Sequence, residues 1–359
     1  MMTPLDSLTA LGTSVWLDGL VPPAELERLT RVARVTGLTS NPTIFRAAVL
    51  GTDRYTPRIA ALAGRSPAVI YETLAIEDVR AAADVLEPVF ARSRGADGFV
   101  SLEVDPALAD DADGTVAAAR ELWARIDRPN AMIKIPGTAA GVKATRRATA
   151  DGINVNVTLL FSVERHAAVA NAYVAGLEER SRRGAPVAGI ASVGSFFVSR
   201  VDTAVDPALA RIGRHDLIGR AAVANARLAY ARAAELFGGP RFGALRAAGA
   251  RAQRPLWAST GTKDARYSDV KYVDELAGPG VINTMPPATL SAYADHGAPA
   301  DRLTATEPAA RSVIDGLARA GIDLDAVTDD LLADGIARFA ASMDELLAGV
   351  SAAAGMRAA

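Results

Sequence analysis

The sequence predicts a single α/β domain, residues 1–359, of the (β/α)8 TIM-barrel class with extra helices. Eight short apolar runs alternate with longer helical ones, and no linker or change of composition divides the chain. A length of 359 residues suits one enlarged barrel. We expect a short N-terminal lead-in over residues 1–13 and a C-terminal helical segment from about residue 307. Periodicity alone leaves a doubly wound sheet as the alternative.

The expected strands are short runs rich in branched apolar residues. In chain order they are Ser14–Asp18, Gly37–Ser40, Phe99–Val104, Ala131–Ile135, Ile153–Leu160, Gly189–Val193, Leu256–Ser259 and Val281–Asn283.

Helices with recognisable ends lie between these strands. Pro22 and Pro23 begin a helix over Ala24–Thr36, and Ser66 with Pro67 begins another that extends to about Arg92. Ser162 is placed to cap a helix over Val163–Arg182. Further helical stretches near Ile212–Phe237 and Ser312–Leu347 are candidates for outer barrel helices or for the interface of a homodimer.

Several of the strands carry polar residues on one face, although a strand buried on both faces is usually apolar throughout. Asn156 and Thr158 alternate with valine and leucine, and Asp18, Glu103 and Lys134 hold equivalent places in three other strands. Each could separately be a charge that faces solvent at a strand end. Together they match the carboxyl end of a barrel, where catalytic residues gather.

Composition excludes several classes of function. The 39 basic and 41 acidic residues give a net charge of −2, so we expect neither nucleic acid nor a membrane as a partner. The absence of cysteine excludes disulfides and thiolate chemistry. The first 13 residues do not resemble a secretory signal and no run reaches membrane length, which predicts a cytoplasmic protein.

Common cofactor motifs are also absent. The chain has no GxGxxG after a strand, no phosphate-binding P-loop, no HExxH and no GxSxG, and its three histidines lie far apart. Asp18, Glu103 and Asp105 could converge on a metal ion, but Lys134 would compete for the same space. We therefore expect no metal and no cofactor.

Lysine is rare in the chain, because only Lys134, Lys143, Lys263 and Lys271 occur among the 39 basic residues. Lysine has an amine that can form an imine, whereas arginine does not. Lys134 on a strand, with acids on neighbouring strands, suits attack on a ketone followed by carbon–carbon cleavage through the protonated imine. A simple salt-bridging lysine is the alternative that the strand alone leaves open.

Six ordered motifs resemble those of the transaldolases. They are SVWLDG (14–19), GLTSNPTIF (37–45), SLEVDP (101–106), MIKIPGT (132–138), INVNVTLLFS (153–162) and SFFVSRVD (195–202). WASTGTK (257–263) and NTMPP (283–287) extend the resemblance, which covers the chain from about residue 14 onward.

The resemblance implies transfer of a dihydroxyacetone unit between ketose and aldose phosphates in the pentose phosphate pathway. Lys134 would form the Schiff base, Asp18 would exchange the proton of the C4 hydroxyl, and Glu103 would act on a water held with Thr158. The resemblance also implies residues that bind the sugar phosphate, namely Asn41, Asn156, Ser195, Phe197, Arg200 and Lys263.

The resemblance implies that two of these residues, Arg200 and Lys263, bind the phosphate of the sugar. Arg200 matches the family's phosphate-binding arginine, although a pair with Asp202 or Glu164 is an alternative for it. Lys263 stands where many members have arginine, and a lysine binds phosphate as a point charge rather than bidentately.

Two other functions are weighed against transfer. A fructose 6-phosphate aldolase-like enzyme would release free dihydroxyacetone, but such relatives have Gln and Tyr where this chain has Glu103 and Phe197. A non-catalytic sugar-phosphate-binding barrel is the other, since fold does not fix function.

Overall fold

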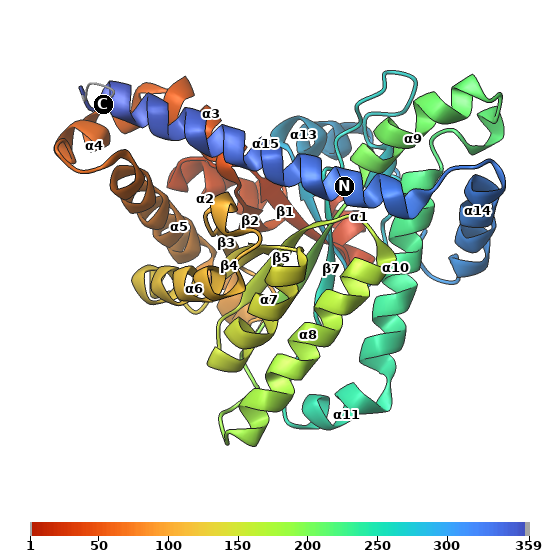
Figure 1. Ribbon diagram of the computed structural model, residues 1–359, viewed down its shortest axis with the longest axis horizontal. Helices are drawn as coiled ribbons and strands as arrows, with labels where there is room; N and C mark the ends of the chain where they lie inside the picture. Colours follow the sequence, from red (N-terminus) through yellow and green to blue (C-terminus); the bar gives the residue numbers. More distant parts are fainter. Residues whose placement is uncertain (1, 356–359) are drawn as a thin grey trace.

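The computed structural model describes residues 2–355. Eight parallel strands close into a barrel in the sequential order β1 to β8, with helices around them (Figure 1). The strands are β1 (Ser14–Asp18), β2 (Val35–Thr39), β3 (Val100–Glu103), β4 (Ala131–Pro136), β5 (Val155–Leu160), β6 (Ser192–Phe197), β7 (Arg254–Ala258) and β8 (Ile282–Met285). The predicted (β/α)8 barrel is confirmed, and the doubly wound alternative is wrong.

The helices of the described residues fall between and after these strands. They are α1 (Pro4–Ala10), α2 (Pro23–Val32), α3 (Pro42–Gly51), α4 (Thr56–Ala61), α5 (Pro67–Arg92), α6 (Ala112–Ile126), α7 (Ala139–Asp151), α8 (Val163–Arg182), α9 (Ser199–Arg211), α10 (Ala221–Gly238), α11 (Pro240–Ala247), α12 (Lys271–Glu275), α13 (Pro287–His296), α14 (Glu307–Arg319) and α15 (Leu324–Ala353). Three short 3₁₀ turns are η1 (Asp53–Tyr55), η2 (Pro106–Leu108) and η3 (His215–Leu217).

Local sequence signals explain several helix ends. The Ser162 hydroxyl accepts a hydrogen bond from the Arg165 amide at 3.1 Å, so the predicted cap of α8 is confirmed. Ser66 caps α5 in the same way. The predicted helix over Ala24–Thr36 is too long, because Arg34 adopts a φ of 55° that ends the helical path before β2.

The sixth strand lies later in the chain than predicted. Instead of Gly189–Val193, β6 spans Ser192–Phe197. Gly189 has a φ of 87° and belongs to the preceding turn. Gly194 lies within the strand, and the close approach of His166 explains the glycine there, since a Cβ would lie 3.0 Å from His166 Nε2.

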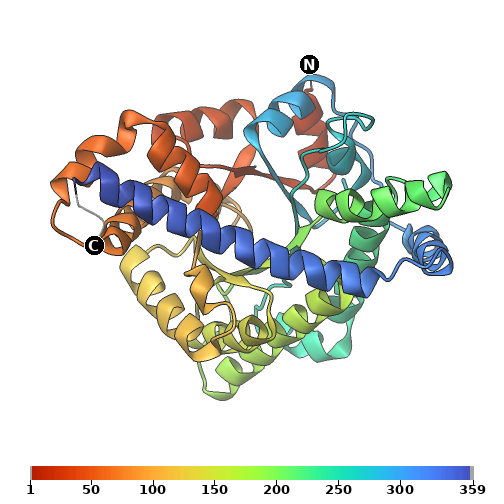
Figure 2. The same ribbon diagram turned by 45° about the horizontal axis from the view of Figure 1, so that its top comes forward.

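The predicted lead-in contains α1, which packs against α13. The predicted C-terminal segment is two helices, α14 and α15, separated at Gly321, whose φ is 78°. Figure 2 shows α15 crossing one end of the barrel, and this helix contacts α3, α5, α9 and the end of β5. Gly335 allows the close approach, because a Cβ there would lie 2.9 Å from the Leu159 side chain.

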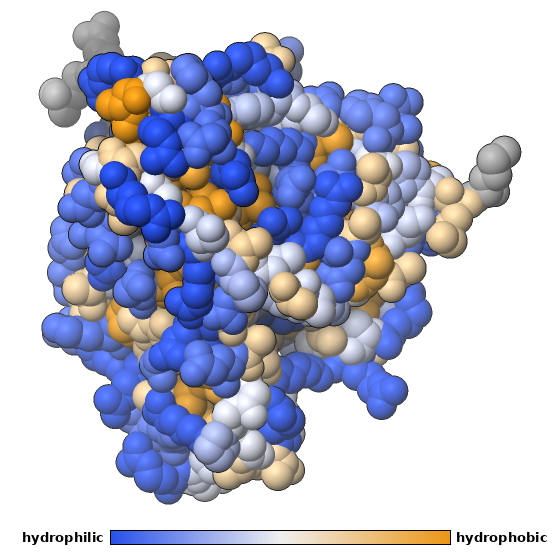
Figure 3. All heavy atoms as spheres, turned by 90° about the vertical axis from the view of Figure 1, so that its right-hand side faces the viewer, coloured by the Kyte–Doolittle hydropathy of each residue, from blue (hydrophilic) through white to orange (hydrophobic). Residues whose placement is uncertain are grey.

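The side of the molecule seen in Figure 3 is mainly hydrophilic, with hydrophobic residues in small separate areas. Among residues 2–355, none of the helices combines the length and the hydropathy that crossing a bilayer requires.

Candidate active site

Three consecutive strands place three polar residues at one level of the barrel. The backbone register pairs Glu103 with Lys134, and Lys134 with Asn156. Paired residues on neighbouring parallel strands direct their side chains to the same face, so all three point to the barrel interior. The alternation predicted from the sequence is therefore present in three dimensions.

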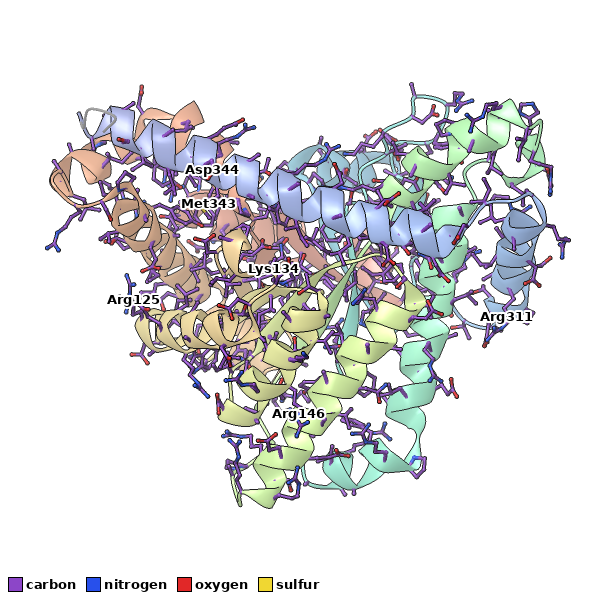
Figure 4. All side chains as sticks on the ribbon, viewed as in Figure 1. Arg125, Lys134, Arg146, Arg311, Met343 and Asp344 are labelled. Atoms are coloured by element: carbon purple, nitrogen blue, oxygen red, sulfur yellow. The ribbon has the colours of Figure 1, made fainter. Side chains whose placement is uncertain are left out.

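Lys134 lies at the centre of this group, and its residue is only 4% exposed. Its Nζ donates a hydrogen bond to the Ser40 carbonyl oxygen at 3.0 Å and lies 3.6 Å from Glu103 Oε2. Figure 4 shows Lys134 within the barrel beneath α15. A buried amine with one carbonyl and one carboxylate close to it can lose its proton to a nearby base and attack a carbonyl carbon.

Both acids beside Lys134, Glu103 and Asp18, have raised pKa values. Burial raises the pKa of Glu103 to about 7, although the Lys134 ammonium opposes this shift. Burial also raises the pKa of Asp18, while Lys134 and a hydrogen bond from Thr39 work in the opposite direction. A carboxyl group whose pKa is near 7 can give and take protons at neutral pH, as a general acid–base catalyst must.

A hydrogen-bonded chain of hydroxyl groups orients Asp18. The Thr39 hydroxyl donates to Asp18 Oδ1 at 2.8 Å and lies 2.6 Å from the Thr284 hydroxyl. Both threonines line the same cavity as Asp18. Neither threonine is among the predicted site residues, although Thr39 is part of a quoted motif and lies on the same face of β2 as Gly37.

The mouth of the barrel contains a cavity of about 170 Å³, here called the mouth cavity. Seven of the ten predicted site residues line it, and they are Asp18, Asn41, Lys134, Ser195, Phe197, Arg200 and Lys263. Phe339 of α15 also lines it. No motif near the strands could have indicated Phe339, because it comes from a helix far along the chain.

The other three predicted residues do not line this cavity. Asn156 is fully buried, accepts a hydrogen bond from the Ser195 hydroxyl at 2.7 Å and donates one to Ser101 at 3.0 Å. The Thr158 hydroxyl is buried without a hydrogen-bond partner in the described residues. Glu103 contacts Lys134 but is absent from the lining of the mouth cavity.

Asn41 has a structural contact in addition to its place in the mouth cavity. Its Oδ1 accepts a hydrogen bond from the Ile44 amide at 2.9 Å and so caps α3. This bond fixes the side chain and leaves the two N–H donors of its amide for a ligand hydroxyl.

The rim of the mouth cavity carries two cations. The Arg200 guanidinium lies 5.4 Å from the centre of the Phe197 ring, and its Nη1 has no hydrogen-bond partner in residues 2–355. Asp202, an alternative partner for Arg200, instead accepts hydrogen bonds from the Ala222 amide and the Tyr272 hydroxyl. Lys263 is exposed in the loop after β7. Two cations here can hold an anionic group.

Asp105, which was considered above as a metal ligand, does not line the mouth cavity. Its side chain is exposed and accepts a hydrogen bond from the Ala107 amide at 2.9 Å, which caps the turn η2. Over the described part of the chain, no group of three or more histidine or acidic side chains is arranged to hold a metal ion.

Known proteins are similar to this chain over nearly its whole length. The family model described as Transaldolase/Fructose-6-phosphate aldolase matches residues 15–350. The chain is 48% identical over 351 residues to the transaldolase of Saccharopolyspora erythraea, covering 96% of this chain and 95% of that protein. It is 49% identical over 354 residues to the transaldolase of Mycolicibacterium paratuberculosis, covering 96% and 95%. It is 48% identical over 357 residues to Transaldolase 1 of Streptomyces coelicolor, covering 97% and 94%. The chain therefore belongs to the transaldolase/fructose-6-phosphate aldolase family.

Proposed function

We propose that Lys134 forms a Schiff base with the ketone of a sugar phosphate, and that this barrel transfers a dihydroxyacetone unit between ketose and aldose phosphates. The chain is an enzyme, a transferase of the transaldolase type, as its relatives of 46 to 49% identity over nearly their whole length support. The observation that carries the residue assignment is the buried Lys134 amine, 3.6 Å from Glu103 and in the same cavity as Asp18.

The proposed reaction begins with attack of the Lys134 amine on the C2 ketone of the donor. Glu103 gives a proton to the hydroxyl of the resulting carbinolamine, through a water held with Thr158, and water leaves to form the iminium. Asp18 then takes the proton of the C4 hydroxyl. The C3–C4 bond breaks and its electrons enter the iminium, which gives an enamine and a free aldose phosphate.

The second half of the reaction reverses these steps with another aldose phosphate. The enamine carbon attacks the acceptor carbonyl, Asp18 returns its proton, and water hydrolyses the new imine. Asn41 and Ser195 are placed to bind hydroxyl groups of the three-carbon unit, since they line the mouth cavity with Lys134. Asn156 pairs with Lys134 in the barrel and accepts a hydrogen bond from Ser195, and it is proposed to bind the same unit. The overall exchange converts sedoheptulose 7-phosphate and glyceraldehyde 3-phosphate to erythrose 4-phosphate and fructose 6-phosphate.

The phosphate of each sugar is proposed to bind Arg200 and Lys263 at the rim. Arg200 has a free donor in the described residues and a guanidinium steadied by the Phe197 ring, which suits two N–H groups on a phosphate. Lys263 adds a point charge.

Borohydride trapping tests the assignment directly. With fructose 6-phosphate, reduction fixes a three-carbon adduct, and peptide mass spectrometry should place it on Lys134. Lys134→Arg keeps the positive charge but should abolish both adduct and turnover. A label on Lys143, Lys263 or Lys271 instead, or a fully active Lys134→Arg protein, would remove the mechanism.

The alternative in which free dihydroxyacetone is released is not favoured, because the curated relatives bear the name transaldolase. The non-catalytic barrel is likewise disfavoured by the retention of Lys134, Asp18 and Glu103. A cytoplasmic location, the lack of nucleic-acid or membrane partners and a homodimer stay predictions. Sedimentation velocity at several protein concentrations tests the homodimer.

A further inference from the structure

Glu103 lies between two cavities rather than in one. Its carboxylate contacts Lys134, which lines the mouth cavity, yet Glu103 itself lines a second cavity of about 120 Å³. This second cavity, here called the side cavity, is bounded by α5, α6 and the far part of α15, through Tyr71, Ala118 and Met343 among others.

The inner end of the side cavity is polar. Glu103 Oε2 is buried and has no hydrogen-bond partner among residues 2–355, since the Lys134 ammonium at 3.6 Å is beyond hydrogen-bonding distance. A buried carboxylate oxygen without a protein donor is costly unless water solvates it. A cavity of about 120 Å³ is large enough for several water molecules, each of which needs only a few tens of Å³.

The side cavity is also lined by Tyr71, Glu72, Asp105 and Glu121, among residues that are mainly apolar. Burial and the nearby carboxylates of Glu103 and Asp105 raise the pKa of Tyr71, which therefore keeps its proton and can donate a hydrogen bond to water. At the surface, Glu72 and Glu121 both pair with Arg125, which Figure 4 places on the outer side of α6. The side cavity thus combines hydrogen-bonding groups at Glu103, at Tyr71 and at the surface with a lining that is otherwise mainly apolar.

We propose that the side cavity is a water passage to Glu103, separate from the mouth through which the sugars enter. When the imine forms, Glu103 gives its proton to the carbinolamine hydroxyl, the C–O bond breaks, and the released water leaves through the passage. In the return step, water from the passage attacks the iminium carbon and its proton goes to the Glu103 carboxylate. The two steps balance without another reactant.

Two separate cavities meet two opposite requirements of the reaction, the exclusion of bulk water and the supply of one water molecule. The enamine must wait for an acceptor without being hydrolysed, so bulk water has to stay out of the mouth cavity, which α15 and Phe339 cover. Hydrolysis nevertheless consumes a water at each turnover. A passage that opens behind Glu103 supplies that water only where Glu103 can use it. This inference rests on the proposed imine at Lys134.

The test narrows the passage with a larger side chain and measures how fast the C2 oxygen of fructose 6-phosphate exchanges with H₂¹⁸O. Mass spectrometry gives the exchange rate, from which the rate of an enzyme-free sample is subtracted. Ala118→Leu adds bulk on the cavity side of α6, and Ala117→Leu makes the same change at an exposed neighbouring position outside the cavity. We expect Ala118→Leu to slow exchange about tenfold and Ala117→Leu to leave it unchanged, because one ordered water at Glu103 is lost only in the former.

Tyr71→Phe is the second variant, because it keeps the ring edge-on to Phe45 at 5.5 Å and removes only the hydroxyl. We expect it to slow exchange about fivefold, as the loss of one hydrogen bond to passage water would. Competitive inhibition by inorganic phosphate, which reports on the mouth cavity, should be unchanged in both variants. Exchange at the wild-type rate in Tyr71→Phe, or weaker phosphate inhibition in both variants, would overturn the passage.

Failure of the proposed function would look different from failure of the passage. If wild-type protein gave no borohydride adduct on Lys134, the imine itself would be refuted. If the adduct formed on Lys134 and all three variants exchanged oxygen alike, only the passage would be refuted.

Discussion

The hydroxyl of Thr39 is expected to set the acidic limit of activity, and Thr39→Val tests this with a nearly isosteric change. The hydroxyl donates to Asp18 Oδ1 at 2.8 Å, and Asp18 is proposed to take a proton from the substrate in its ionised form. A hydrogen bond to a charged group contributes about 1.5–3 kcal/mol. Its loss disfavours the carboxylate and should raise the pKa of Asp18 by about one to two units.

The assay is the pH dependence of kcat/KM for fructose 6-phosphate with erythrose 4-phosphate as acceptor. Because Asp18 must be ionised to act as the base, the acidic limb of the profile should move upward by about one to two pH units in Thr39→Val. Thr284→Val is the control, since Thr284 contacts Thr39 at 2.6 Å but makes no hydrogen bond to Asp18 in the described structure. Its limb should move less.

Stability provides an independent check on the same reasoning. A carboxyl group whose folded pKa lies above its unfolded value weakens the fold at pH values where the unfolded chain is ionised. Thr39→Val should therefore lose more stability at alkaline pH, where Asp18 is ionised, than at acidic pH below the raised pKa of Asp18, where the carboxyl group is protonated. A uniform drop in kcat/KM with an unmoved acidic limb would refute the role given to Thr39.

Three further predictions follow from contacts described above. Gly37→Ala should lower the free energy of unfolding by about 3 kcal/mol in urea titration, because its Cβ would lie 2.3 Å from the Trp16 ring. Gly51→Ala, with open space around it, should be neutral or stabilising. Equal stability of the two variants would contradict this. Arg200→Met should raise KM for fructose 6-phosphate by about a hundredfold and Lys263→Met by about tenfold, with little change for unphosphorylated fructose, because Arg200 is half-buried beside Phe197 and Lys263 is exposed. Since burial raises the pKa of Glu103 to about 7 from a usual value near 4.5, its ionisation should cost the fold up to about 3 kcal/mol as pH rises between these values. Glu103→Gln should thus gain stability relative to wild type between pH 4.5 and pH 8 in thermal unfolding, and a constant difference would contradict the raised pKa.

The sequence was sufficient to predict the barrel and the group around Lys134, because alternation has a fixed consequence in a parallel strand. Glu103, Lys134 and Asn156 are each flanked by apolar residues, so the three polar side chains were expected to point to the same side of the sheet. Asp105, which was considered only as a possible metal ligand, follows the end of β3, where the chain turns and alternation no longer decides the direction of a side chain.

Other parts of the fold and site depend on contacts that no local pattern expresses. Gly194 lies inside β6, and the reason for a glycine there is the ring of His166 from α8, which leaves little room for a larger side chain. Phe339 reaches the mouth cavity only because α15 folds back over the barrel, which is a consequence of packing between distant segments. Local sequence patterns therefore do not predict side-chain directions beyond strand ends or contacts between distant segments.

The pairing of Glu103 with Lys134, and of Lys134 with Asn156, has a consequence for folding. If β4 slipped by one residue against its neighbours, Ile133 or Ile135 would enter the barrel and the amine would be directed among the surrounding helices. Such a misassembled barrel would keep its helices and much of its compactness, yet could form no imine at this place. Trapping a substrate on Lys134 therefore reports on strand alignment as well as on chemistry, and gives a way to count correctly assembled molecules during refolding.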